Sequence, residues 1–126
     1  MDDLYQQLIL DHYHNPQNRG ELENADLKQE EANASCGDEF AFFIKWGKDK
    51  RGNKTIQEIS FTGQGCAIST AACSLLTEEL KGKAAEVIPE LTLEYMQSLL
   101  GIKVTLARQK CVMLPVRAMQ KLINYL

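Results

Sequence analysis

The chain of 126 residues is long enough for one globular domain with a buried core and too short for two. Its 14 basic and 17 acidic residues give a formal net charge of -3, which argues against nucleic acid or a membrane surface as a partner. No run of apolar residues approaches the roughly 20 that a membrane span needs. The acidic start, MDDLYQQLIL, lacks the charge of a targeting signal, so we expect a cytoplasmic protein with reduced cysteines.

The first half of the chain is predicted to form one helix and a small sheet. Apolar residues at spacings of four predict an amphipathic helix over residues 3–13, which ends near Pro16. A short strand is expected near residues 27–31. Two runs rich in aromatic and β-branched residues, with a Gly-Asn turn between them, predict a β-hairpin over residues 39–62.

The second half is predicted to be helical. Small and apolar residues in helical register predict a helix over residues 66–80, and a second helical stretch ends at Gly101. Pro115 is tolerated best in a first turn, which predicts that the last helix starts at about residues 111–114. The expected fold class is therefore α+β, with a small antiparallel sheet of about three strands packed against several helices in a single domain, residues 1–126.

The four cysteines suggest metal or thiol chemistry, since a reducing compartment does not favour a disulfide frame. Cys36 is predicted in a loop at the edge of the sheet, Cys66 at a strand-to-helix junction, and Cys111 at the start of the last helix. With Asp38 they would offer three thiolates and one carboxylate, a plausible four-coordinate zinc site with one exchangeable ligand. Because no CxxC pair is present, buried free cysteines remain the alternative, and for Cys73 that interpretation is favoured.

Charged residues near Cys111 have two interpretations. Arg108 and Lys110 are either solvated charges on a loop or cations that lower the pKa of the thiol and hold an anionic cluster. His12 and His14 are interpreted as surface residues near the end of the first helix. No hydrolytic triad, nucleotide-binding loop or metalloprotease motif is present, which leaves hydrolysis and phosphoryl transfer without support.

Several motifs, in order along nearly the whole chain, resemble one known family. They are LYQQLILDHYHNPQNRG near the start, CGD at residues 36–38, GQGCAIS around Cys66, LKGK at residues 80–83 and ARQKCVML around Cys111. The chain resembles the U-type iron-sulfur cluster assembly proteins, which comprise IscU, SufU and the N-terminal domain of NifU. The resemblance implies a SufE/NifU-like fold and a solvent-facing site made of Cys36, Asp38, Cys66 and Cys111.

What the resemblance implies about chemistry centres on sulfur transfer. It implies that Cys111, or else Cys36, accepts persulfide sulfur from a pyridoxal-phosphate cysteine desulfurase of the SufS, IscS or NifS type. A transient 2Fe-2S cluster or a zinc ion would occupy Cys36, Asp38, Cys66 and Cys111. Apo iron-sulfur proteins or carrier proteins would receive the product.

The chain departs from the IscU pattern near the third site cysteine. Lys110 stands where IscU-type proteins usually have histidine, and IKVTLARQ replaces their LPPVK chaperone-docking motif. Both differences favour the SufU-type branch and argue against a dedicated heat-shock chaperone. The short separation of Cys66 and Cys111, however, leaves no room for the insertion that SufU-type proteins usually carry.

Three functions follow from these observations. The first is a scaffold that accepts sulfur and assembles a 2Fe-2S cluster, which the carboxylate of Asp38 would make labile and transferable. The second is a zinc-dependent sulfurtransferase, or sulfur relay, that activates a cysteine desulfurase. The third is a purely structural zinc protein, against which the aspartate argues, because structural zinc sites are usually closed by cysteine and histidine.

Overall fold

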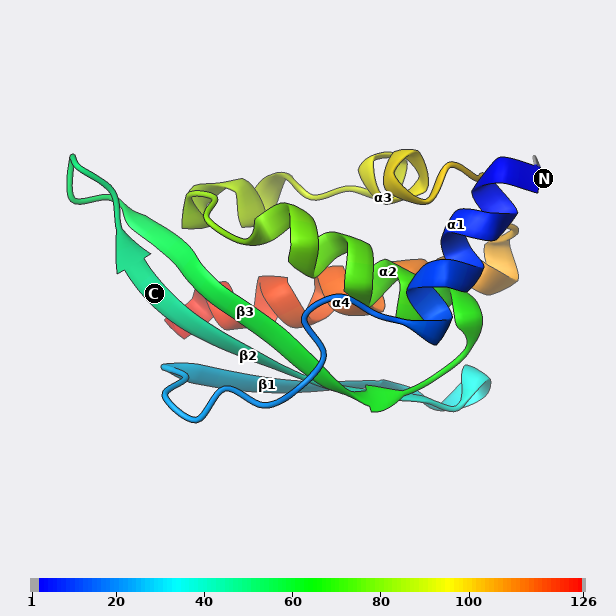
Figure 1. Ribbon diagram of the computed structural model, residues 1–126, viewed down its shortest axis with the longest axis horizontal. Helices are drawn as coiled ribbons and strands as arrows, with labels where there is room; N and C mark the ends of the chain where they lie inside the picture. The colour runs from blue at the N-terminus through cyan, green and yellow to red at the C-terminus, as the bar shows by residue number, and fades with distance from the viewer. Residues whose placement is uncertain (1–2, 126) are drawn as a thin grey trace.

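A computed structural model describes residues 3–125 of the chain (Figure 1). Its longer elements, in chain order, are α1 (Asp3–His14), β1 (Leu27–Asn33), β2 (Asp38–Lys48), β3 (Lys54–Gln64), α2 (Ala67–Leu80), α3 (Leu93–Leu100) and α4 (Leu106–Leu122). Short 3-10 helices are η1 (Ala34–Cys36), η2 (Ala85–Glu90) and η3 (Ile123–Tyr125). A three-stranded antiparallel sheet accompanied by helices confirms the predicted α+β class. Within residues 3–125, no helix is both long and hydrophobic enough to cross a bilayer.

The sheet has the strand order β1-β2-β3, so the predicted hairpin is confirmed and the short first strand becomes an edge strand. The register places Asn33 opposite Asp38 at one end of β2. At the same end Gly63 pairs with Phe40, and a Cβ at Gly63 would lie 2.1 Å from a neighbouring carbonyl oxygen. Only glycine permits so close an approach of the two strands where the cysteine loop begins.

Helices α2 and α4 pack together and cover one face of the sheet, with α4 against β1 and α2 against β3 (Figure 1). The core between these layers is formed by large side chains that are almost completely buried, among them Phe42, Phe61, Leu76, Met96 and Leu114. Inward-facing residues of β2 alternate with outward-facing ones, as expected for a sheet with one covered face. Since Asp38 faces inward at the end of this pattern, the fold buries its carboxylate beside the helices.

The prediction for the last helix was wrong at its start. Helix α4 begins at Leu106, after the N-cap Thr105, so that Pro115 lies in its interior. An interior proline costs about 3 kcal/mol. The helix nevertheless continues because its apolar face, which includes Val112, Leu114, Val116, Met119 and Leu122, is fully buried, and each such side chain contributes roughly 1.5–3 kcal/mol.

The other predicted helices are confirmed, with boundaries shifted by at most a few residues. Between them the sequence pattern gave no indication of η2, a six-residue 3-10 helix that contains Pro89. The segment between α1 and β1 is irregular, and here Asn18 has φ 60°. Its carbonyl accepts the Phe61 N–H at 3.0 Å, and Gly20 N–H donates to the Phe61 carbonyl at 2.8 Å. This segment therefore runs along the free edge of β3 and brings Arg19 towards the cysteine loop.

Candidate metal centre

Cys36 reaches the site from η1, the single turn that connects β1 to β2. Gly37 ends this turn with φ 68°, in the left-handed region that favours glycine, and its N–H donates to the Ala34 carbonyl. The Cys36 side chain is half-buried. As the sequence predicted, this thiol lies in a loop at the end of the sheet.

Asp38 is the first residue of β2, and only 1% of its surface is exposed. Its Oδ1 accepts the Cys66 N–H and the Ser69 hydroxyl, both at 2.9 Å. Its Oδ2 is buried and has no hydrogen-bond partner among the described residues. Because a buried, unpaired carboxylate oxygen is costly, a cation bound beside Oδ2 would supply the partner it lacks. The donor set here therefore fits a metal ion.

Cys66 is the N-cap of α2, at the strand-to-helix junction predicted from the sequence. Its sulfur accepts the Ser69 N–H at 3.4 Å, as an N-cap side chain does at the start of a helix. The residue before it must be glycine: a Cβ at Gly65 would lie 2.5 Å from Asp38 Oδ1 and 2.6 Å from Ser69 Oγ. The bare backbone at this position is what lets the aspartate, the serine and the helix start meet.

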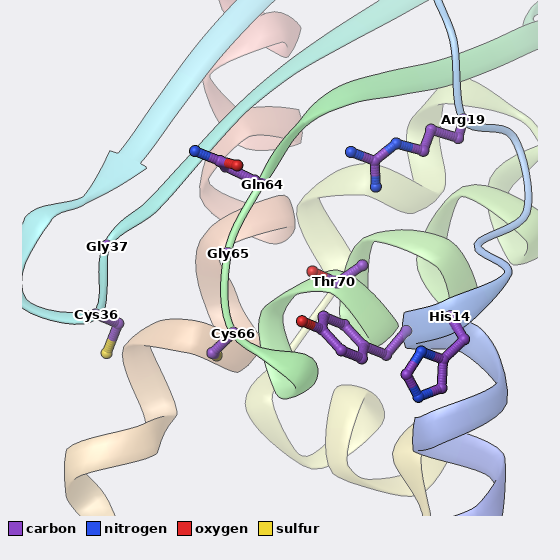
Figure 2. Close-up of a pocket in the computed structure, with 9 residues that line it drawn as sticks. His14, Arg19, Cys36, Gly37, Gln64, Gly65, Cys66 and Thr70 are labelled. Carbon is purple, nitrogen blue, oxygen red and sulfur yellow. The ribbon is translucent and has the colours of Figure 1, made fainter.

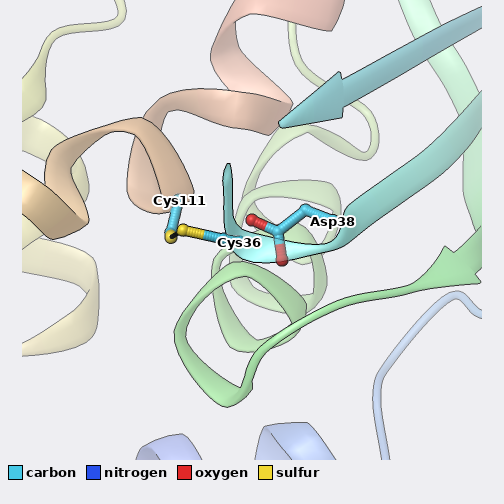
Figure 3. Close-up of side chains that lie close together, drawn as sticks. All are labelled: Cys36, Asp38 and Cys111. Atoms are coloured by element: carbon cyan, nitrogen blue, oxygen red, sulfur yellow. Dashed lines mark hydrogen bonds between the residues drawn. The ribbon is translucent and has the colours of Figure 1, made fainter. Parts of the chain in front are cut away.

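Cys111 lies in the second turn of α4 and not at its start, because the helix begins five residues earlier than the range in which it was predicted. The side chain is 0% exposed, and its sulfur is 3.1 Å from the sulfur of Cys36 (Figure 3). Asn33 Nδ2 approaches the same sulfur at 3.9 Å. Burial and the hydrogen bond with Cys36 raise the pKa of the Cys111 thiol well above its ordinary value. A bound cation would reverse this preference and hold the thiolate.

The ligand atoms of Cys36, Asp38 and Cys111 all lie within 4.8 Å of one another, with the carboxylate directed at the two sulfurs (Figure 3). In a tetrahedral zinc-thiolate site the ligand atoms are roughly 3.8 Å apart, so small side-chain movements would let one ion contact all three. The sulfur of Cys66 is not in this group, and it is hydrogen-bonded with the hydroxyl and the N–H of Ser69, both at 3.4 Å. Its charge nevertheless contributes to the raised pKa of Cys111, which places it beside the other three.

The family resemblance implied a solvent-facing site, and the structure corrects that expectation. Asp38 and Cys111 are buried, whereas Cys36 and Cys66 are partly exposed. Two of the four candidate ligands are thus buried, and the other two lie at the opening of the site. A ligand set of this kind can exclude bulk water from one side of an ion while leaving the other side open to a reaction partner.

The sequence left two interpretations for Arg108 and Lys110. In the structure the two side chains differ in how closely they approach the thiols. A hydrogen bond with Cys111, and then the nearby charges of Cys66 and Cys111, raise the pKa of Arg108. Arg108 is therefore directed at the thiols, although its side chain is exposed. Lys110 is exposed and lines a shallow hollow with Cys36 and Arg108. Both cations thus stand on the α4 side of Cys36.

A pocket of about 630 Å³ opens on the other side of Cys36 (Figure 2). Its lining includes Tyr13, His14, Arg19, Cys36, Cys66 and Thr70. The two cysteines stand on one side of the pocket, and Arg19 and His14 stand across from them. The partly exposed Cys36 and Cys66 therefore face a pocket whose opposite side carries the side-chain nitrogens of Arg19 and His14.

Three further residues outside the cluster, Cys73, His12 and His14, also had predicted roles. Cys73 is fully buried in α2, which confirms the structural interpretation, and burial raises the pKa of its thiol. The surface interpretation of His12 was wrong: its ring is half-buried, and Nδ1 is 2.6 Å from Ser74 Oγ, which ties α1 to α2. His14 is exposed, as predicted, and lines the pocket.

The sequence analysis missed two residues that shape the site. Ser69 bonds both Asp38 and Cys66, and the spacing Cys-x-x-Ser at a helix start, which resembles a capping box, was an available signal. Arg19 donates to the Gly63 carbonyl. No local pattern indicated that contact, because it depends on how the segment after α1 crosses the end of β3.

Comparison with known proteins gives consistent matches over this site and fold. The family described as NifU-like N terminal domain matches residues 4–125. The chain is 32% identical to the zinc-dependent sulfurtransferase SufU of Bacillus subtilis, over 96% of this chain and 90% of that protein. It is 37% identical to the iron-sulfur cluster assembly scaffold protein IscU 1 of Archaeoglobus fulgidus, over 78% of this chain and 61% of that protein.

Solved structures share the fold. A putative iron-sulfur cluster assembly scaffold protein for the SUF system from Fervidobacterium islandicum superposes with a TM-score of 0.77 and 26% identity, covering 91% of this chain and 93% of that one. The N-terminal part of a NifU-like protein from Brucella abortus has a TM-score of 0.72 at 18% identity, which shows likeness of fold alone. The alignment with the Bacillus protein runs over 138 positions, more than the 126 residues here, so that relative has additional residues within the matched range.

Proposed function

The chain belongs to the family of NifU-like N-terminal domains, and on this basis we propose that it is an iron-sulfur cluster assembly scaffold. In this proposal it accepts persulfide sulfur from a cysteine desulfurase and holds a nascent, labile 2Fe-2S cluster. The ligands are Cys36, Asp38, Cys66 and Cys111. The cluster is cargo, which apo iron-sulfur proteins or carrier proteins then receive.

One observation carries the proposal: the buried Oδ2 of Asp38 has no hydrogen-bond partner among the described residues, and a carboxylate oxygen of Asp38 lies within 4.8 Å of the sulfurs of Cys36 and Cys111. A closed structural site would leave no such oxygen, since its ligands would be sulfur or imidazole. A carboxylate is a harder ligand than a thiolate and holds iron less firmly. One weak ligand among four is suited to a site that must release what it binds.

The different exposure of the thiols supports an order for sulfur entry. Cys36 and Cys66 are partly exposed, whereas Cys111 is buried directly behind Cys36, 3.1 Å from its sulfur. The acceptor expected from the family resemblance, Cys111, is therefore within reach of a persulfide only after the η1 turn moves, or by way of Cys36. We propose both as acceptors, with Cys36 the first to meet the donor.

A second function, zinc-dependent sulfur relay, is favoured by a different observation. The Bacillus subtilis relative, which aligns with 96% of this chain, is named as a zinc-dependent sulfurtransferase. Three thiols and one carboxylate also fit zinc, which when bound would keep the thiols deprotonated for attack on sulfur. Arg108 and Lys110 on the α4 side of Cys36 would then face the incoming persulfide.

Anaerobic reconstitution distinguishes these functions. Metal-free protein is incubated with a cysteine desulfurase, cysteine and ferrous iron, and the iron and acid-labile sulfide that each chain retains are measured after desalting. For the scaffold we expect near-equal iron and sulfide, lost in the Cys36→Ser, Cys66→Ser and Cys111→Ser variants. Cys73→Ala is the matched control, because this buried thiol lies outside the cluster, and it should retain both.

Two other results would change the conclusion. A persulfide that forms without retained iron, and only when zinc has been restored, would establish the sulfur relay. Full retention of iron and sulfide in the three serine variants would contradict the ligand assignment altogether.

A further inference from the structure

We propose that the pocket beside Cys36 and Cys66 binds small thiols that carry a carboxylate, and that Arg19 selects them as recipients of sulfur from the site. The inference rests on the proposed acceptance of persulfide sulfur, and it adds a class of small-molecule substrate. Sulfur would leave the protein by exchange with a free thiol as well as by assembly into a cluster.

The pocket has the size and the arrangement that such a ligand needs. Its volume of about 630 Å³ lies within the range of small-molecule sites. The partly exposed thiols of Cys36 and Cys66 stand on one side, and the guanidinium of Arg19 projects into the pocket from the other (Figure 2). A short thiol bound to Arg19 through its carboxylate would therefore direct its sulfur towards the cysteines.

Arg19 is held in place but still available to a ligand. The side chain is exposed, and its Nη2 donates to the backbone carbonyl of Gly63. That bond uses one of the five N–H donors of the guanidinium and fixes its direction. A planar guanidinium anchored in this way is suited to a bidentate contact with a carboxylate. His14 and Thr70 add polar groups to the same pocket.

The charge around Cys36 differs from that of the rest of the molecule. Among the described residues that line this pocket there is no aspartate or glutamate, although the chain has 17 acidic residues. Other hollows on the surface contain Glu30 and Glu39, or Glu79 and Glu90. An anionic ligand is therefore favoured at this pocket and disfavoured at those two; the hollow lined by Arg108 and Lys110 also has no acidic residue in its described lining, but Cys66 is not part of it.

An alternative explanation, which needs no ligand, is that Arg19 balances the charge of the thiolates. Arg108 already occupies that position, since it is hydrogen-bonded to Cys111 and influenced by the charges of Cys66 and Cys36. Arg19 instead bonds a backbone carbonyl across the pocket from the sulfurs. The two arginines thus stand on different sides of the cluster: Arg108 lines a hollow with Cys36 and Lys110, whereas Arg19 lines the pocket that both partly exposed thiols share.

The chemical step is an exchange with no net oxidation. The thiolate of the small molecule attacks the outer sulfur of a persulfide, Cys–S–SH, on Cys36, the proposed acceptor that lines the pocket. A new S–S bond forms to the incoming thiol while the bond between the cysteine Sγ and the outer sulfur breaks. The electron pair of the broken bond stays on Sγ, which takes the proton released by the incoming thiol. The products are a small-molecule persulfide and the free cysteine.

The test measures how fast the full chain, loaded with persulfide, loses its sulfur to probe thiols. Loading is done with a cysteine desulfurase and, separately, with sodium tetrasulfide, and the remaining persulfide is followed by alkylation and intact mass. The probes are 3-mercaptopropionate, 2-mercaptoethanol and cysteamine. For each probe the rate for wild type is divided by that for Arg19→Gln, which cancels the intrinsic reactivity of the probe.

We expect this ratio to be about ten for 3-mercaptopropionate, as for the loss of one charge-assisted hydrogen bond, and below about two for the other probes. Arg19→Lys should restore most of the rate, and propionate should compete with 3-mercaptopropionate in wild type. Arg51→Gln, in the exposed turn between β2 and β3, is the matched control and should behave as wild type.

Equal ratios for all three probes would overturn the inference, because Arg19 would then act on the cysteines and not on the ligand. A ratio of one for each probe, or no competition by propionate, would also overturn it. Failure of loading by the desulfurase alone would contradict the proposed function while the exchange remained measurable on the chemically loaded chain. Failure of both loading routes would overturn both.

Discussion

Two aspartates stand at opposite ends of β2, and they differ in how their oxygens are bonded. Asp49 is exposed in the turn after β2, where Oδ1 accepts the N–H groups of Arg51 and Asn53 at 2.9 Å and Oδ2 accepts the Asn53 side-chain amide at 3.2 Å. Asp38 is buried at the start of β2, and among the described residues only its Oδ1 accepts hydrogen bonds. A carboxylate with both oxygens hydrogen-bonded stabilises a turn, whereas a buried carboxylate with one unpaired oxygen can bind a cation.

The largest expected effect is on metal affinity, and it should separate the two aspartates. Asp38→Asn removes a charged ligand and should weaken zinc binding about 100-fold, because loss of a first ligand is at least as costly as loss of its supporting partners. Asp49→Asn should leave the affinity unchanged. Competition with a chromophoric chelator measures both constants, and equal affinities for the two variants would refute the difference between the aspartates.

Replacing glycine by alanine should also change stability differently near Asp38 and near Asp49. Gly65→Ala places a Cβ against Asp38 and Ser69, and we expect the free energy of unfolding to fall by about 2 kcal/mol, with loss of zinc binding. Gly52→Ala, in the turn after β2, meets no atom within 4 Å and should cost only the strain of φ 83°, about 1 kcal/mol. Urea unfolding of the metal-free proteins measures both changes. A smaller loss for Gly65→Ala than for Gly52→Ala would contradict the crowding at the site.

A smaller effect is expected from the serine that orients Asp38. Ser69→Ala removes the hydroxyl that bonds Oδ1, and zinc affinity should fall about tenfold. Ser60→Ala is a suitable control because its buried hydroxyl has no partner in the described structure, so its removal should change neither affinity nor stability adversely. Calorimetric titration with zinc gives both values, and a similar affinity loss for both would show a general effect of core serines.

The smallest effect concerns the pH dependence of stability at the turn. Hydrogen bonds from Asn53, and then from Arg51 and Gly52, lower the pKa of Asp49. The folded carboxyl is thus more acidic than the unfolded one, and its stabilisation is present above the unfolded pKa and lost as the pH falls through the folded pKa. Asp49→Asn should therefore lower Tm by roughly 1–3 °C at pH 7, and less at pH 3. A larger Tm difference at pH 3 than at pH 7 would contradict this sign.

The sequence predicted most of the fold because hydrophobic periodicity decided most elements. The predicted hairpin and the helices over residues 66–80 and up to Gly101 depend on patterns that tertiary contacts reinforce. The start of α4 was mispredicted because Pro115 was treated as a local signal, while the fully buried apolar face on both sides of it decides the helix. A proline does not end a helix when the residues on both sides of it bury enough apolar surface to offset its cost.

The candidate site was predictable in composition and less so in arrangement. Cys36, Asp38 and Cys111 come together as expected. The first two lie where β1 is connected to β2, and α4 passes the same end of the sheet. The burial of Asp38 and Cys111 could not be predicted, because it depends on the register of β1 with β2 and on where α4 starts. Nor could the approach of Arg19 to the pocket, which depends on backbone pairing along β3.

The coordination shell of zinc bound to the full chain, measured by X-ray absorption at the zinc edge, tests the ligand assignment directly. We predict three sulfur ligands at about 2.3 Å and one oxygen at about 2.0 Å, with the oxygen at this distance lost or lengthened in Asp38→Asn. A shell of four sulfurs, or one unchanged by this substitution, would show that Asp38 is not a ligand and would contradict the assignment of the site.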